Sequence, residues 1–229
     1  MTLHLVETRK IYIFRDQNIL NTLKNNINNF LKSNLSEYKF RQPTNLNEGL
    51  PLNIEPELPR LEIKSITNDI IIVISVERLE VIFTFDNNNY YANYNTLKNI
   101  FQKFDNLFID KEFYPTRLAM QGMFLYRTKN PKTILLNKLN QSFKNPIEPI
   151  LQFGERYTLE NSNFHINDTY TFQTGIEDNI IKKNEVVIIR RDLNTNETPK
   201  ALDQSIIDLF NIKLNSYLDE NKISEYLGI

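Results

Sequence analysis

Glu62 and Lys64 are the first residues whose types and spacing suggest chemistry. They stand two positions apart in a short apolar run that is typical of a strand. Metal-dependent nucleases use an acidic residue and a lysine in this spacing to hold Mg²⁺ and to orient the attacking water. The same acidic-x-Lys triplet occurs at two other places in the chain, and no aspartate precedes it at a convincing distance. We therefore expect no nuclease site here.

His165 and Asp168 form a second candidate pair. A carboxylate can orient an imidazole that acts as a general base. No motif marks a serine nucleophile, and the chain contains no cysteine. A histidine in an alternating strand is more often a surface or cross-strand residue than a catalytic one, so we expect no catalytic role for this pair.

The composition excludes several further kinds of site. Because the chain has no Cys, it has no disulfide framework, no Cys-ligated zinc and no thiol nucleophile. Its two His cannot build a His-rich metal site, and its five scattered Gly form no Gly-rich phosphate loop. We therefore expect no catalytic residues, no metal and no cofactor.

The stretch 113–147 is the clearest charge feature of the chain. It contains six basic side chains and no acidic one, whereas the preceding stretch 45–112 contains eleven acidic and six basic residues. The basic residues are Arg117, Arg127, Lys129, Lys132, Lys138 and Lys144. Phe124 and Tyr126 stand next to Arg127 in a predicted strand. Such a combination suits base stacking with phosphate contact, as in RNA-recognition modules.

Two kinds of partner fit this stretch. Blocks of opposite charge can steer the association of two proteins, whereas basic groups beside aromatic rings suit nucleic acid. The sequence pI near 6.2 is low for a nucleic-acid-binding protein, so the sequence favours a protein partner. Under either interpretation we predict that Arg117, Arg127, Lys129, Lys132 and Lys138 are the interaction residues.

The stretch 42–60 contains four of the nine prolines. Proline fixes φ and removes a backbone donor, so this stretch is expected to be a long irregular loop. Loops of this length are uncommon inside a compact domain. Two interpretations stay open, namely a binding loop and an extended segment that lies on the surface.

Periodicity predicts an α+β fold with the order β-α-βββ-α-β followed by α-βββ-α. Period-two runs predict strands at 10–14, 61–66, 70–76, 79–85, 118–126, 151–159, 164–174 and 185–191. Apolar residues at i, i+3, i+4 and i+7 predict helices at 16–33, at 92–108, from 130 onward and at 200–219, with a short turn at 223–227.

The first half of this order resembles the ferredoxin-like order β-α-β-β-α-β with one extra strand. The second half also has a strand-rich centre and a closing helix. We therefore predict two related modules with mixed or antiparallel sheets and packed helices. They are an N-terminal module at 1–129, which contains the Pro-rich loop 42–60, and a C-terminal module at 130–229.

Several landmarks resemble a family of sporadically distributed, uncharacterised bacterial proteins of about this length. They are Pro56-Glu-Leu-Pro59, the helix from Tyr94 to Phe108, the strand opening Thr116-Arg-Leu-Ala119 and the late strand Val186-Val-Ile-Ile-Arg-Arg-Asp192. The family usually has Gly where this chain has Ala119. The resemblance implies no catalytic residues, and the patchy distribution of the family implies mobile or defence-associated genes.

The sequence as a whole predicts a non-catalytic interaction or scaffolding subunit of a bacterial or phage multi-protein assembly, with antiviral defence as its setting. The first alternative is a nucleic-acid-binding subunit that uses the basic region 113–147, and the second is an enzyme whose site no motif marks. No apolar run reaches the roughly 18 residues that a membrane helix needs, and the N-terminus lacks the pattern of a signal peptide. We therefore expect a cytoplasmic protein without membrane contact; its oligomeric state is left open.

Overall fold

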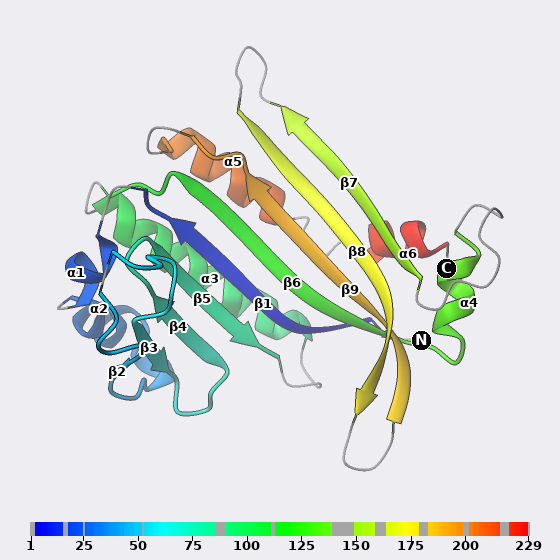
Figure 1. Cartoon of the computed structure of the whole chain (residues 1–229), viewed down its shortest axis with the longest axis horizontal. Helices are drawn as coiled ribbons and strands as arrows, with labels where there is room; N and C mark the ends of the chain where they lie inside the picture. Colours follow the sequence, from blue (N-terminus) through cyan, green and yellow to red (C-terminus); the bar gives the residue numbers. More distant parts are fainter. Residues whose placement is uncertain are drawn as a thin grey trace.

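One antiparallel sheet organises the chain (Figure 1). The computed structural model describes residues 3–15, 18–24, 26–51, 53–85, 90–110, 113–138, 149–158, 164–178, 183–198, 202–215 and 220–228. Within these ranges the fold mixes helices with strands, which confirms the predicted α+β class.

The sheet has nine strands in the order β2-β3-β4-β5-β1-β6-β9-β8-β7, and all neighbouring strands are antiparallel. The strands are β1 (Leu3–Ile13), β2 (Thr44–Asn45), β3 (Leu61–Lys64), β4 (Ile70–Ile74), β5 (Arg78–Thr84), β6 (Arg117–Arg127), β7 (Ile150–Thr158), β8 (His165–Asp178) and β9 (Lys183–Thr195). Each predicted strand is found, although β1, β8 and β9 are longer than periodicity suggested.

The helices are α1 (Ile19–Lys24), α2 (Ile27–Asn34), α3 (Tyr90–Asp110), α4 (Pro131–Leu136), α5 (Gln204–Asn215) and α6 (Glu220–Leu227). The helix expected at 16–33 is divided into α1 and α2. The apolar positions 139 and 143, expected in the helix from 130, lie outside the described residues. The expected turn at 223–227 belongs to α6. None of the helices in the described ranges is both long and apolar enough to cross a bilayer.

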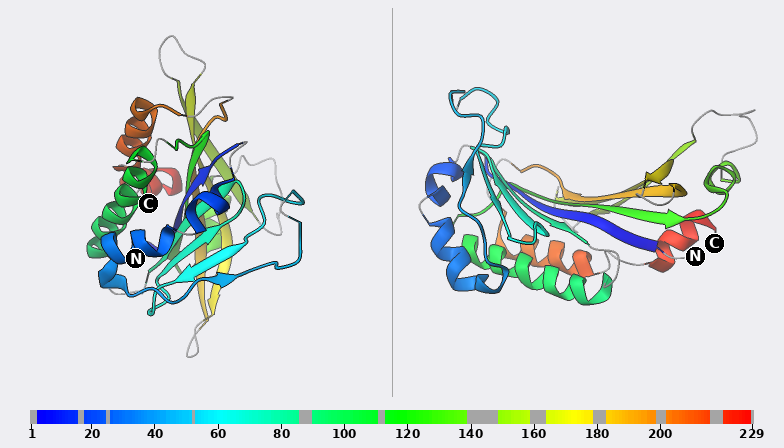
Figure 2. Two further views of the ribbon diagram at one scale, coloured as in Figure 1. Left: turned by 90° about the vertical axis from the view of Figure 1, so that its left-hand side faces the viewer. Right: turned by 90° about the horizontal axis from the view of Figure 1, so that it is seen from below.

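The helices α1, α2, α3, α5 and α6 all lie on one face of the sheet, and α4 lies at its end beside α6 (Figure 2). Side chains on a strand alternate between the two faces. On β6, Leu118, Met120 and Phe124 therefore point toward the helices and are fully buried, whereas Gln121 points to the other face and is exposed. The hydrophobic core thus lies between the sheet and this single layer of helices.

The first segment, 1–129, contributes the strands β1 to β6, and the second contributes β7 to β9. The two segments meet where β6 pairs with β9 over nine residue pairs. In the first segment the neighbours are ordered β6-β1-β5-β4, with β3 and β2 outside β4. In the second, β7, β8 and β9 form a meander. The division into two modules at 129 stays a prediction.

Candidate interaction surface

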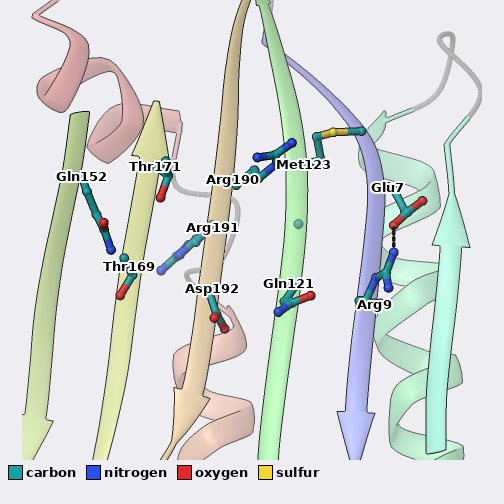
Figure 3. A pocket seen from close by; sticks show the side chains of 11 residues that line it. Glu7, Arg9, Gln121, Met123, Gln152, Thr169, Thr171, Arg190, Arg191 and Asp192 are labelled. Carbon is teal, nitrogen blue, oxygen red and sulfur yellow. Dashed lines mark hydrogen bonds and ion pairs between the residues drawn. The ribbon is translucent and has the colours of Figure 1, made fainter. Parts of the chain in front are cut away.

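The face of the sheet opposite the helices carries a hollow of about 530 Å³ (Figure 3). No helix of the described ranges covers this face, which we call the open face (Figure 2). The hollow spans the five strands β1, β6, β9, β8 and β7. Its lining residues are Glu7, Arg9, Gln121, Gly122, Met123, Gln152, Thr169, Thr171, Arg190, Arg191 and Asp192.

The strand register brings these side chains into two adjacent rows across the sheet. One row runs Arg9, Gln121, Asp192, Thr169 and Gly154, and the other runs Glu7, Met123, Arg190, Thr171 and Gln152. Residues two apart on a strand share a face, so each strand places one residue in each row. Toward β7 the first row ends in Thr169 and Gly154, whose small side chains leave space for the hollow.

Four polar side chains in the hollow have no partner among the residues that the structure describes. The side chains of Gln121, Gln152, Thr169 and Thr171 form no hydrogen bond with the part of the chain that the structure describes. The exposed Arg190 donates one long hydrogen bond, of 3.5 Å, to Gln173 and pairs with no carboxylate in the described ranges. The hollow therefore presents donors and acceptors to whatever binds there.

Both signs of charge occur on the open face, and many of the charges are paired. Arg9 lies 2.5 Å from Glu7 and 3.3 Å from Glu80, and Arg78 lies 2.8 Å from the same Glu80. Nucleic-acid phosphates are bound by unpaired cations that replace counterions. A mixed and largely neutralised field instead matches a protein surface, which also carries both signs.

The sequence-predicted residues Arg117 and Arg127 lie at the two ends of β6. Arg117 donates to Asn194 at 3.3 Å. Arg127 forms a bidentate pair with Glu177, with both N–O distances at 2.6 Å, and donates to His4 Nε2 at 3.2 Å. The charge of Arg127 is thus already neutralised inside the protein, and this residue fastens β6 to the distal end of β8.

The predicted lysines gather around α4 and not around the hollow. Lys129 precedes this helix, Lys132 lies within it and Lys138 follows it, and all three are exposed. Lys138 extends over Gly228 at the end of α6, where a β-carbon would lie 2.5 Å from its Nζ. None of the five predicted residues lines the hollow among the described residues.

The prediction that Phe124 and Tyr126 form a base-stacking surface on β6 is wrong. Phe124 and Tyr126 point toward the helices and are 0% and 6% exposed, so neither ring can stack on a base. The alternation of the strand explains this result, since positions 124 and 126 lie on the opposite face from positions 117 and 127. The odd and even spacing of these residues in the sequence already predicts that the rings and the arginines lie on opposite faces.

His165 and Asp168 are also separated by strand alternation. His165 lies on the open face, whereas Asp168 is 1% exposed beneath the sheet and accepts two hydrogen bonds from Arg191, at 2.8 and 2.6 Å. Glu62 and Lys64 form an ion pair of 2.9 Å with each other. In the described part of the chain, no three His, Asp or Glu side chains cluster closely enough to hold a metal ion.

Sequence reasoning missed Arg190, Gln121 and Gln152 as surface residues. The predicted strands 118–126 and 185–191 contained two of them, but their apolar neighbours dominated the pattern. Side chains alternate between the two faces of a strand. This alternation would have placed Gln121 on the face opposite Phe124, and Arg190 on the face opposite its buried neighbour Ile189. The alignment of these residues into rows depends on the register of distant strands, which a single sequence does not specify.

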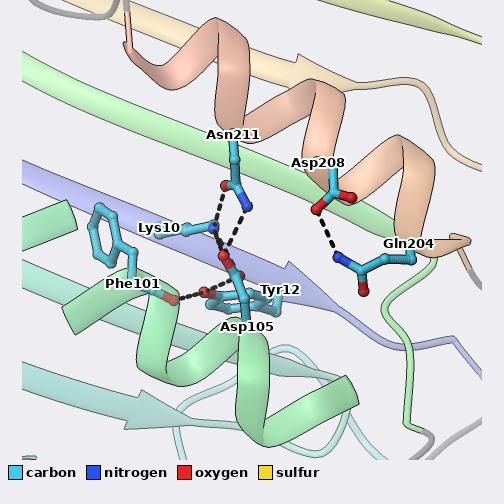
Figure 4. A network of polar contacts seen from close by, with 7 residues as sticks. All are labelled: Lys10, Tyr12, Phe101, Asp105, Gln204, Asp208 and Asn211. Carbon is cyan, nitrogen blue, oxygen red and sulfur yellow. Dashed lines mark hydrogen bonds and ion pairs between the residues drawn. The ribbon is translucent and has the colours of Figure 1, made fainter. Parts of the chain in front are cut away.

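A buried polar network beneath the sheet is the other notable cluster (Figure 4). Lys10 on β1 is 0% exposed, and its Nζ lies 2.8 Å from both carboxylate oxygens of Asp105 on α3 and 3.0 Å from Asn211 on α5. Tyr12 donates to Asp105 at 2.9 Å. Burial lowers the pKa of Lys10, partly offset by Asp105, and raises the pKa of Tyr12. Because Lys10 is sealed from solvent, we assign this network a structural role that joins β1, α3 and α5.

Substitution of Asp105 by Ala is expected to destabilise the protein by about 3–5 kcal/mol, because it leaves the Lys10 ammonium buried without a counter-charge. The double substitution Lys10→Met with Asp105→Leu is expected to recover most of this loss. The free energy of unfolding from urea titration measures both. A loss below about 1 kcal/mol for Asp105→Ala would contradict the role given to the pair.

The Arg127–Glu177 pair is expected to contribute to stability and not to binding. The hydrogen bonds from Arg127 lower the pKa of Glu177 below its ordinary value of 4.5. The contribution is therefore complete above pH 4.5 and is lost as the pH falls through the lower, folded-state value.

A double-mutant cycle with Arg127→Gln and Glu177→Gln is expected to give a coupling of about 1–2 kcal/mol at pH 7, and a smaller one at pH 3. Urea unfolding at the two pH values is the measurement. A coupling near zero at pH 7, together with lost partner binding for Arg127→Gln, would return this residue to the interaction surface.

Comparison with known proteins adds no family to these observations. No protein-family model matches the sequence, and no curated protein sequence is significantly similar to it. The resemblance to a sporadically distributed bacterial family therefore stays a prediction.

Proposed function

We propose that this protein is a non-catalytic binding or scaffolding subunit that holds a partner protein on the open face of its sheet. One observation carries the proposal. The central strands present two rows of polar side chains around a hollow of about 530 Å³, and four of these side chains, Gln121, Gln152, Thr169 and Thr171, have no partner in the described ranges. Protein interfaces commonly contain about one hydrogen bond per 100–200 Å², which such rows can supply.

The charge distribution favours a protein over a nucleic acid. Arg9 and Arg78 are paired with carboxylates, and Arg190 and Asp192 bring both signs to one strand. The rings of Phe124 and Tyr126, which the nucleic-acid interpretation needs for base stacking, are buried. The exposed Lys129, Lys132 and Lys138 support a partner contact at α4, and their cluster is the basis of the nucleic-acid alternative.

Three of the titratable groups with a shifted pKa belong to the core and have a structural explanation. Burial raises the pKa of Tyr12 and of Tyr170, and it lowers the pKa of Lys10. All three lie between the sheet and the helices, on the face opposite the hollow. Catalytic groups with shifted pKa values usually open into a cleft, whereas these are enclosed by the core.

A ferredoxin-like first segment is part of the same proposal. Strand β5 lies between β1 and β4, and β1 lies between β5 and β6. Helix α3 links β5 to β6, and β1 lies between these two strands, which is the pattern of a split β-α-β module. The setting that we propose, a bacterial or phage assembly in antiviral defence, rests on the family resemblance alone.

Substitution of Arg190 by Glu is expected to weaken partner binding about tenfold or more, because it reverses the one cation of the hollow that has no carboxylate partner in the described ranges. The control Lys32→Glu makes the same charge change on α2, on the helical side. Tagged protein from the native cells identifies the partner, and titration with the purified partner measures the affinity.

Two results would contradict the proposed function. One is equal affinity of Arg190→Glu and the control. The other is the absence of a protein partner combined with salt-sensitive binding to RNA or DNA that Lys129→Glu with Lys132→Glu abolishes. The second result would establish the nucleic-acid alternative.

A further inference from the structure

The Pro-rich stretch 42–60 is organised around one buried arginine. Arg60 is 5% exposed, and its guanidinium donates to four backbone carbonyls of the loop. The acceptors are the carbonyls of Asn47 at 3.2 Å, Leu50 at 3.3 Å, Pro51 at 3.2 Å and Ile54 at 2.9 Å. The side chain of Arg60 thus provides hydrogen-bond donors for four backbone carbonyls of the loop.

The backbone of the loop needs this support. Asn47, Gly49 and Glu55 have φ values of 52°, 93° and 49°, in the left-handed region that non-glycine residues rarely adopt. Prolines add no backbone donors that could hold such turns. Asn47 adds a side-chain hydrogen bond to the carbonyl of Pro59 at 2.8 Å. The loop is therefore held in one shape before any partner arrives.

This shape exposes apolar side chains. Leu50 is 45% exposed and Ile54 is 48% exposed, although both have carbonyls fastened to Arg60. Beside them, Glu48, Glu55 and Glu57 are exposed and form no ion pair with the described residues. Since Arg60 is buried, the loop exposes two apolar side chains and three carboxylates without ion-pair partners in the described ranges.

The loop also stands on the side that the proposed function uses. In both views of Figure 2 it rises past the sheet away from α3 and α5, so that it flanks the open face. A partner seated on the open face would meet the loop at the β2–β3 end of the sheet. The inference below rests on the proposed binding role.

We propose that the loop is a preformed docking element for the same partner protein. Leu50 and Ile54 insert into an apolar pocket of the partner, and lysines or arginines at the rim of that pocket meet Glu48, Glu55 and Glu57. Arg60 is a positioning residue, because it touches the backbone of the loop and not the partner. A loop that is already ordered loses little conformational entropy on binding, which favours affinity.

Photo-crosslinking in the native cells tests this proposal. A crosslinking amino acid replaces Leu50, Gln121 on the open face, or Lys32 on the helical side as the control. The expected result is one protein captured from both Leu50 and Gln121 but not from Lys32. Its crosslinked peptide from Leu50 should be apolar and flanked by lysine or arginine.

The other outcomes separate the two proposals. Capture at Gln121 with none at Leu50 would overturn the docking role of the loop and leave the proposed function standing. Absence of capture at both positions would overturn both. Capture of a second copy of this chain at Leu50 would overturn the assigned partner and identify the loop as a contact between copies.

Affinity for the purified partner supplies the quantitative test. Leu50→Ser with Ile54→Ser should weaken binding at least tenfold, whereas Ile212→Ser, which removes an isoleucine 62% exposed on α5, should leave it unchanged. Glu55→Lys with Glu57→Lys should slow association and reduce its salt dependence. Equal affinities for all of these variants and the unmodified chain would overturn the proposal.

Arg60→Met tests the positioning role separately. Hydrogen exchange should become faster at the amides of Leu50, Ile54 and Leu58, whose hydrogen bonds lie within the loop, and affinity should fall with it. Unchanged exchange in the loop would contradict the role given to Arg60.

Discussion

The remaining features depend on one constraint: the helices α1, α2, α3, α5 and α6 all lie on one face of a nine-stranded sheet. Strand alternation then assigns each side chain either to the core or to the open face. On β6, Phe124 enters the core while Met123 lines the hollow. The same rule separates His165 from Asp168, and it turns the rings of Phe124 and Tyr126 into the core.

Charges that alternation directs into the core are matched inside the protein. Lys10 has Asp105, and Arg191 has Asp168, with N–O distances of 2.6–2.8 Å. Unpaired burial of such groups would cost several kcal/mol each. The first pair therefore joins strand β1 to helix α3, and the second joins the neighbouring strands β9 and β8. The open face has no such requirement, because water can satisfy its polar groups. A rigid sheet with polar groups still available on one face is what a scaffolding role needs.

The sequence was sufficient for most elements and insufficient for their arrangement. Apolar alternation located the central strands, and the i, i+3, i+4 spacing located α3. Strand β1 was expected only from Lys10 onward, because the β-branched and aromatic run begins there, whereas residues 7–9 are polar. The rows around Arg190 depend on the register of strands far apart in sequence, and the function of Arg60 depends on carbonyl groups, which residue types do not reveal. The Pro-rich composition marked the loop, but its fixed shape follows from that one guanidinium.

The methyl signals of the methionines test the central claim most directly, because Met120 and Met123 lie on opposite faces of the same strand. Met120 is 0% exposed beneath the sheet, and Met123 lines the hollow. With ¹³C-methyl methionine in the full chain, addition of the purified partner protein should shift or broaden the Met123 signal while the Met120 signal stays in place. An unchanged Met123 signal in the presence of bound partner would contradict the claim that the open face is the binding surface.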